Sequence, residues 1–125
     1  MRRAKRKTTG VAAVGAAGAV IRCRYQRLGI PRRFKIHGHE VVVTIIPTPK
    51  WPHSKMAVGM WDPNLHRIDL RNDLGETELQ AVFCHELVHC LLDSFNHKLS
   101  HDEAFVDNLG TVLAQALATF NSKLR

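Results

Sequence analysis

The chain has 125 residues, of which 45% are hydrophobic and 23% are charged. These proportions are typical of a single globular domain and exclude a disordered chain or a protein with two large cores. The formal net charge of +7 is unevenly distributed, because residues 1–35 hold eleven Lys and Arg and no acid, whereas the remainder holds seven basic and eleven acidic residues. The basic character therefore belongs to the N-terminal part, and the rest of the chain is acidic.

Residues 1–33 are predicted to form a flexible basic arm. Its first seven residues are polybasic, and residues 8–21 are uncharged and rich in alanine, glycine and valine. This outline leaves an export signal in residues 1–22 open as an alternative, and a surface or nucleic-acid contact as another. The uncharged stretch is too short and too rich in glycine to span a bilayer, so no transmembrane segment is predicted.

The sequence contains three cysteines, Cys23, Cys84 and Cys90, which do not make a disulfide framework. An odd number of cysteines favours a reducing compartment, and we expect a cytoplasmic location. Cys84 and Cys90 are interpreted as small core residues rather than metal ligands.

A first β-hairpin is predicted between residues 34 and 46. Two segments rich in β-branched residues, 34–37 and 40–46, flank a tight turn around Gly38. His37 and His39 lie at the tip of this hairpin, where we expect them to be solvated turn residues.

A second hairpin follows a proline-rich loop at residues 47–55. Its strands are residues 56–61 and 66–70, joined by the turn signal Asp62-Pro63-Asn64. Together the two hairpins predict a small antiparallel sheet of about four strands. Trp51 and Trp61 are interpreted as packing residues at the sheet surface, with a place in a substrate groove as the alternative for Trp61.

Residues 76–95 contain no helix breaker and are apolar on nearly every side, which predicts the central helix of the domain. Asp73 and Glu76 stand in the relation of a capping box at its start. The helix contains the pattern H-E-x-x-H at residues 85–89. Residues four apart lie on the same face of a helix, so His85 and His89 can bind one metal ion.

Glu86 points about 100° around the helix from His85, where a carboxylate can act as a general base. The alternative is a buried helix in which two core histidines are hydrogen-bonded and the glutamate is paired. Three costly polar groups on an apolar segment favour the metal, because they need a common partner.

A second helix is predicted over residues 101–120, and the short connection at residues 96–99 makes the two helices antiparallel neighbours. One face of this helix is apolar. It consists of Phe105, Leu109, Val112, Leu113, Ala116, Leu117 and Phe120. A second stripe begins at Glu103 and Asp107 and continues through the small residues Gly110 and Ala114, which would let the first helix come close.

Zinc in a catalytic site takes three protein ligands and leaves one position open, so the two histidines need a third. Glu103 is the candidate, although Ser100 and Glu103 also form a capping box pattern. Asp107 lies one turn further on the same stripe, which suits a carboxylate that accepts the free N–H of a zinc-bound histidine.

These residues resemble the signature of gluzincin metallopeptidases, H-E-x-x-H followed on a later helix by E-x-x-x-D. The layout of residues 34–120 is similar to compact minimal gluzincins and to small H-E-x-x-H proteins of bacteriophages and mobile elements. A rival resemblance is to SprT-like metallopeptidases, since His101 and Phe105 read H-x-x-x-F and make His101 the alternative third ligand. The extended metzincin motif is absent, because Phe95 stands where it requires a histidine.

The resemblance implies that residues 34–125 form a small α+β zinc metallopeptidase domain that hydrolyses peptide bonds in a peptide or protein substrate. In the family mechanism, zinc on His85, His89 and Glu103 lowers the pKa of a bound water from about 15.7 toward 7. Glu86 takes the proton of that water and passes it to the leaving amine.

Two parts of the substrate site are less defined. A substrate strand would pair with a sheet edge near residues 57–61. The group that stabilises the oxyanion is open among several residues, which are Tyr25, His53, His66, His97 and His101.

Two other functions remain as alternatives. One is a non-catalytic zinc-binding module with a structural or interaction role, which predicts a closed site of four ligands, for example with His101 added to Glu103. The other is a basic-armed nucleic-acid protein in which the metal is incidental, which predicts salt-dependent binding through residues 1–33.

Overall fold

The structure is a computed structural model that describes residues 26–123, so the predictions made for residues 1–25 lie outside the described residues. The chain divides into two units, Met1–Ile30 and Pro31–Arg125. The second unit is an α+β domain, as predicted, and its first strand begins at Arg33, one residue before the predicted boundary. Within residues 26–123, no helix has the length and apolar character needed to cross a membrane.

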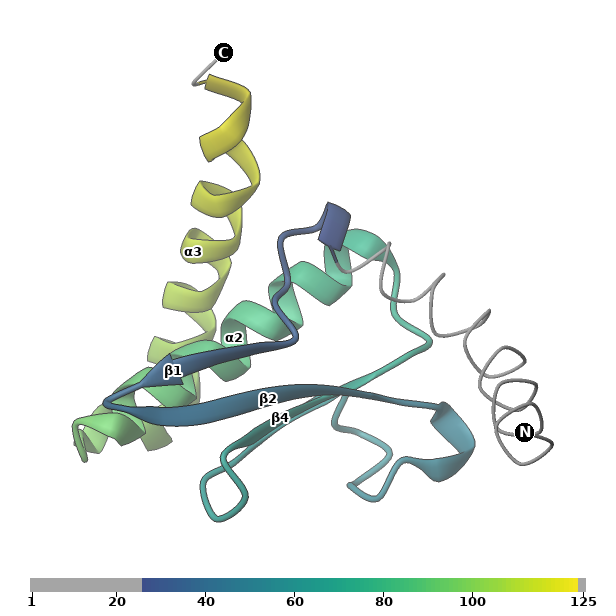
Figure 1. Ribbon diagram of the computed structural model, residues 1–125, viewed down its shortest axis with the longest axis vertical. Coiled ribbons are helices and arrows are strands. Elements are labelled where there is room, and N and C mark those ends of the chain that lie inside the picture. The colour runs from purple at the N-terminus through teal and green to yellow at the C-terminus, as the bar shows by residue number, and fades with distance from the viewer. Residues whose placement is uncertain (1–25, 124–125) are drawn as a thin grey trace, which may run out of the picture. The chain divides into compact units, whose positions relative to one another are not determined.

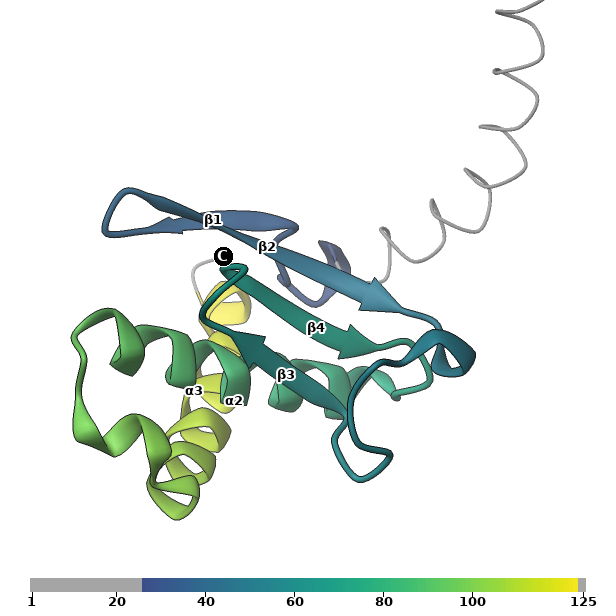
Figure 2. The ribbon, with the colours of Figure 1, turned by 90° about the horizontal axis from the view of Figure 1, so that it is seen from below.

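The sheet has four strands in the order β1-β2-β4-β3 (Figures 1 and 2). The first hairpin pairs β1 (Arg33–Ile36) with β2 (His39–Ile46), and the second pairs β3 (Gly59–Asp62) with β4 (Arg67–Arg71). Both predicted hairpins are therefore confirmed, with a shorter third strand than expected. In the first, the exposed His37 (φ 50°) and Gly38 (φ 81°) form the two-residue turn, and left-handed backbone at both positions suits the twist of a hairpin.

The prediction of a wholly antiparallel sheet is wrong, because β2 and β4 pair in parallel. After β2, the loop at residues 47–58 carries the chain past the next strand position, and β3 forms the edge of the sheet. The second hairpin then returns β4 into the gap between β2 and β3. Local patterns predict each hairpin, but they do not determine which strands of two hairpins meet.

The loop at residues 47–58 contains a short 3-10 helix, η1 (Thr48–Lys50), and side chains of β4 hold it in place. His53 Nε2 lies 2.7 Å from Asp69 Oδ2, and Arg67 Nε donates to Asp69 Oδ1 at 2.7 Å. Arg71 also donates to the carbonyl oxygen of Lys55 at 3.2 Å. Asp69 is fully buried, so His53 and Arg67 supply the hydrogen-bond partners of a carboxylate that would otherwise be costly to bury.

Helix α2 (Glu76–Ser94) packs against one face of the sheet. The core between them is formed by apolar side chains, chiefly Val41, Val43, Ile68, Leu70, Leu79, Phe83 and Val88. The predicted capping box at Asp73 is wrong: Gly75 is the N-cap and makes no side-chain hydrogen bond. Asp73 instead accepts from Arg71 at 2.8 Å, a contact that lowers the pKa of its carboxyl group.

Helix α3 (Glu103–Lys123) follows a second 3-10 helix, η2 (Lys98–His101). It packs on α2 but crosses it steeply instead of running alongside as an antiparallel neighbour (Figure 1). A Cβ atom on Gly110 would lie 3.0 Å from the Cα atom of His85, so the predicted close approach at this small residue is confirmed. The capping box at Ser100 is wrong, because Asp102 caps the helix by accepting from the Phe105 N–H at 3.0 Å.

Candidate metal centre and cleft

Two histidines of α2 and one glutamate of α3 meet where the two helices cross. His85 Nε2 lies 3.1 Å from Glu103 Oε1, and His89 Nε2 lies 3.1 Å from Glu103 Oε2. One ligand atom from each residue lies within 4.8 Å of the others. The structure therefore brings together the three residues that the sequence predicts as zinc ligands.

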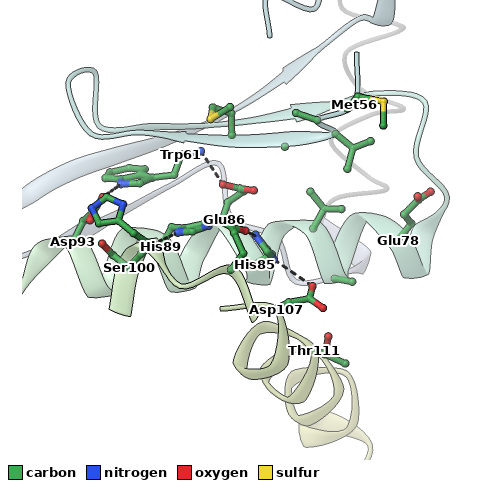
Figure 3. A pocket seen from close by; sticks show the side chains of 18 of the residues that line it. Met56, Trp61, Glu78, His85, Glu86, His89, Asp93, Ser100, Asp107 and Thr111 are labelled. Carbon is green, nitrogen blue, oxygen red and sulfur yellow. Dashed lines mark hydrogen bonds and ion pairs between the residues drawn. The ribbon is translucent and has the colours of Figure 1, made fainter. Parts of the chain in front are cut away.

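The remaining ring nitrogen of each histidine is held by an oxygen atom. His85 Nδ1 lies 3.4 Å from Asp107 Oδ1, an ion-pair distance, and His89 Nδ1 lies 2.6 Å from the carbonyl oxygen of Ser100 (Figure 3). An oxygen at Nδ1 fixes the proton there and leaves the Nε2 lone pair free for a metal. The two Nε2 atoms that face Glu103 are thus the ring nitrogens whose lone pairs could bind a metal ion.

The role of Ser100 was missed because it belongs to the backbone. Sequence patterns predict a role only for its hydroxyl, as a cap for α3. No side-chain pattern indicates that η2 turns the Ser100 carbonyl toward His89. The one available signal was the short connection between the helices, which keeps this backbone next to the second histidine.

Glu86 occupies a different environment from Glu103. It is 8% exposed and points from α2 toward β3, where the Trp61 backbone N–H donates to its Oε1 atom at 2.8 Å (Figure 3). Burial raises the pKa of the Glu86 carboxyl group, and the neighbouring His85 and His89 oppose this shift. A raised pKa makes a carboxylate a stronger proton acceptor, which suits a general base beside the metal ligands.

These groups line a cleft of about 700 Å³ between strand β3, helix α2 and helix α3. Its lining includes six consecutive residues that lead into the edge strand, from Met56 to Trp61. Trp61 belongs to β3, and its indole Nε1 donates to Asp93 of α2 at 2.8 Å. The residue is half-buried, so it both packs on the domain and lines the cleft.

The donor set fits zinc. Two imidazole nitrogens and one carboxylate oxygen are a ligand set that zinc takes in catalytic sites. Within residues 26–123, this is the only group of three potential ligands whose atoms converge. His101 is exposed and lines the cleft but does not belong to the group, which favours Glu103 over His101 as the third ligand.

The two cysteines that flank the motif are buried free thiols, as predicted for core residues. Burial raises the pKa of Cys84 and Cys90 to about 11. A thiol with such a high pKa carries little thiolate near neutral pH, and the thiolate is the form that binds metals. Neither cysteine belongs to the converging ligand group.

Of the described histidines considered for the oxyanion, His101 is the one that lines the cleft. His53, in the loop at residues 47–58, pairs with Asp69. His97 accepts a hydrogen bond from the Leu99 N–H at 3.1 Å. His66 lies in the turn of the second hairpin, where its ring stacks near Trp61. Tyr25 lies outside the described residues.

Comparison of the chain with protein-family models, with curated proteins and with solved structures gives no match. The resemblance to gluzincins and to SprT-like metallopeptidases therefore rests on the motifs alone. What distinguishes the site is its own geometry, in which three ligand groups and a buried glutamate share one cleft.

Proposed function

We propose that this protein is a zinc-dependent peptidase whose ligands are His85, His89 and Glu103. The observation that carries the proposal is the orientation of the two histidines. Both turn Nε2 to the same carboxylate, while Asp107 and the Ser100 carbonyl hold their Nδ1 atoms. A neutral imidazole has one donor and one acceptor nitrogen. With the proton at Nδ1, each Nε2 lone pair faces a carboxylate oxygen that is also an acceptor, and a metal ion between them would satisfy both.

When bound, zinc would supply a Lewis acid that polarises the substrate carbonyl and lowers the pKa of a water molecule. Glu86 would serve as the general base that accepts a proton and returns it to the leaving amine. Its burial keeps the carboxylate away from bulk water. The N–H of Trp61 fixes one of its oxygens, which leaves the other to exchange the proton.

Strand β3 is the edge that an extended substrate would use. The Arg71 N–H donates to the carbonyl of Val58, so the register of β3 and β4 turns the peptide groups of Val58 and Met60 toward β4. Gly59 and Trp61 then turn their peptide groups toward the open edge. The Trp61 N–H is taken by Glu86, so Gly59 and the Trp61 carbonyl are the groups left for an added strand. A peptide that pairs there as an added strand lies along the cleft beside Glu86.

The test compares two glutamate substitutions on the same helix. Glu86→Gln is expected to lower cleavage of a peptide library by about 10²–10⁴-fold, because it removes the general base, while zinc content is retained. Glu78→Gln is the matched control: Glu78 is exposed and lines the same cleft, but it lies at the far end of α2. It is expected to leave cleavage unchanged.

Two results would contradict the proposal. Equal cleavage by the wild type and by Glu86→Gln would show that Glu86 is not the general base. One zinc per chain without cleavage of any library peptide would instead support the non-catalytic zinc-binding module.

A further inference from the structure

The cleft at the candidate metal centre is lined by acidic side chains that no basic side chain offsets. Five carboxylates line it, and within residues 26–123 no lysine or arginine does. The five are Glu78, Glu86, Asp93, Glu103 and Asp107. A cleft lined by one sign of charge concentrates the electric field inside it and favours ligands of the opposite sign. The charge of the lining therefore favours a cationic substrate.

One of these carboxylates is placed to bind the substrate directly. Glu86, Glu103 and Asp107 already belong to the proposed metal centre. Glu78 is exposed at the other end of α2, where water and salt screen its charge. Asp93 is left as the half-buried carboxylate of the cleft that the proposed reaction does not use.

Asp93 lies one helical turn beyond the second histidine. The steps from His85 to His89 and from His89 to Asp93 are four residues each, so the three side chains follow one face of α2. Four residues of a helix span about 6 Å, and an extended peptide rises about 3.3 Å per residue. A substrate residue close to the cleaved bond therefore reaches Asp93.

Trp61 holds one oxygen of the Asp93 carboxylate. The indole Nε1 donates to Oδ2 at 2.8 Å, and the part of the chain that the structure describes supplies no hydrogen bond or ion pair to Oδ1. The carboxylate is thus fixed in position with one oxygen left to accept from a ligand.

A second hollow of about 280 Å³ opens at the same two residues. It shares Trp61, Pro63 and Asp93 with the cleft, and no lysine or arginine among residues 26–123 lines it. Its lining includes three histidines, which in the neutral form offer nitrogen acceptors. They are His37, His39 and His66. A long side chain that extends past Trp61 therefore has space beyond the metal cleft.

We propose that Asp93 binds an arginine or lysine side chain of the substrate, carried within about two residues of the cleaved bond. The inference rests on the proposed peptidase function, because it assigns a substrate class to the same cleft. Asp93 Oδ1 accepts a charge-assisted hydrogen bond from the cationic group. The apolar stem of the side chain packs along the indole of Trp61. Asp93 is thus the residue that determines specificity.

The first experiment compares arginine with citrulline, which keeps the shape of arginine without its charge. Peptides that the wild type cleaves from a library are synthesised again with one or the other residue near the cleaved bond. We expect kcat/KM to be about 10–100-fold higher for the arginine peptide. Cleaved peptides without a basic residue near the bond, or equal cleavage of the pair, overturn the inference. This experiment uses only the wild-type chain, so it does not depend on whether a variant folds.

The second experiment identifies the residue responsible, with Asp93→Asn. The amide oxygen still accepts from the Trp61 indole, so we expect a melting temperature close to that of the wild type. The preference for arginine should disappear, while kcat/KM for the citrulline peptide stays at its wild-type value. A purely structural role of Asp93 would instead lower cleavage of both peptides together and overturn the assignment.

Glu78→Gln is the matched control for Asp93→Asn. It makes the same change at an exposed carboxylate of the same cleft and should keep the preference for arginine. Equal loss of the preference in Glu78→Gln and Asp93→Asn would assign it to the overall charge of the cleft and overturn the role of Asp93.

Peptide binding separates this inference from the proposed function. If the wild type cleaves peptides but does not distinguish arginine from citrulline, the cation site is wrong and the peptidase function stands. If it cleaves nothing, the probe is a short alanine-rich peptide with one arginine, beside its citrulline counterpart, followed by fluorescence anisotropy. Tighter binding of the arginine peptide that is lost in Asp93→Asn would support the cation site in a protein that is not a peptidase. Equal binding of the two peptides would overturn both.

Discussion

The two long helices have similar apolar contents but very different surroundings. Helix α2 lies between the sheet and α3, and its Val88 is 2% exposed. Helix α3 packs on α2 through the side that holds Val106, Gly110 and Ala114, and its Val112 is 62% exposed. The difference shows that an apolar stripe in a sequence predicts burial without telling whether the same chain or another one supplies the cover.

The candidate metal centre joins these two unlike helices. Helix α2 contributes His85, His89 and the buried Glu86, whose positions are set by the core around them. Helix α3 contributes Glu103 and Asp107, whose side chains are 69% and 74% exposed. A metal ion would therefore join a well-buried helix, α2, to a more exposed one, α3. Substitutions in the two helices should accordingly have different effects on stability and on metal binding.

The largest difference is expected from a pair of equal substitutions, Val88→Ser and Val112→Ser. The first introduces a cavity and an unpaired hydroxyl into the core of α2 and should cost about 3 kcal/mol of unfolding free energy. The second replaces an exposed side chain and should change the free energy by less than about 0.5 kcal/mol. Denaturant unfolding at low protein concentration measures both. Equal costs would show that α3 is covered within the monomer.

A smaller effect is expected from Gly110→Ala, which disturbs the contact between the helices. Alanine normally stabilises a helix by about 1 kcal/mol relative to glycine. Here the new Cβ would lie 3.0 Å from the Cα and 3.1 Å from the N of His85. Backbone cannot move aside as a side chain can, so the substitution should destabilise the domain by about 2 kcal/mol.

The exposed helix position Asn108 supplies the control for this change. Asn108→Ala alters helix propensity alone and should stabilise the domain by a few tenths of a kcal/mol. A gain in stability from Gly110→Ala comparable to that of Asn108→Ala would contradict the close approach of the helices.

The smallest effect on the stability of the fold is expected from Asp107→Asn, because the Asp107 side chain is 74% exposed. The amide keeps the shape of the side chain but removes the negative charge beside His85 Nδ1, 3.4 Å away. Loss of such a partner typically weakens zinc binding by about 10–100-fold. Competition with a coloured chelator measures the zinc affinity. An unchanged affinity would mean that Asp107 is a surface residue without a part in the metal centre.

The sequence predicts the parts of this fold that depend on neighbouring residues. The His37-Gly38 turn, the breaker-free run of α2 and the H-E-x-x-H spacing all concern residues close together in the chain, and the structure has these elements where they were expected. The ligand group with Glu103 was also predictable, because the connection between the helices is short and Gly110 marks the point of contact.

The parts that were missed depend on non-local geometry or on the backbone. The parallel pairing of β2 and β4 follows from the path of a proline-rich loop. The Ser100 carbonyl at His89 and the Trp61 N–H at Glu86 are backbone groups, which no side-chain pattern specifies. Asp73 matches the sequence pattern of a capping box, but its carboxylate accepts a hydrogen bond from Arg71 instead of capping α2. In each case a contact outside the local pattern determined the outcome.

Zinc content of the purified chain, measured by elemental analysis beside Glu103→Ala and His101→Ala, tests the metal centre most directly. We expect about one zinc per chain in the wild type and in His101→Ala, loss of zinc in Glu103→Ala, and a lower melting temperature after chelation. If Glu103→Ala keeps its zinc but His101→Ala loses it, His101 is the third ligand in place of Glu103. No zinc in the wild type, with melting unaffected by a chelator, would contradict the metal centre itself.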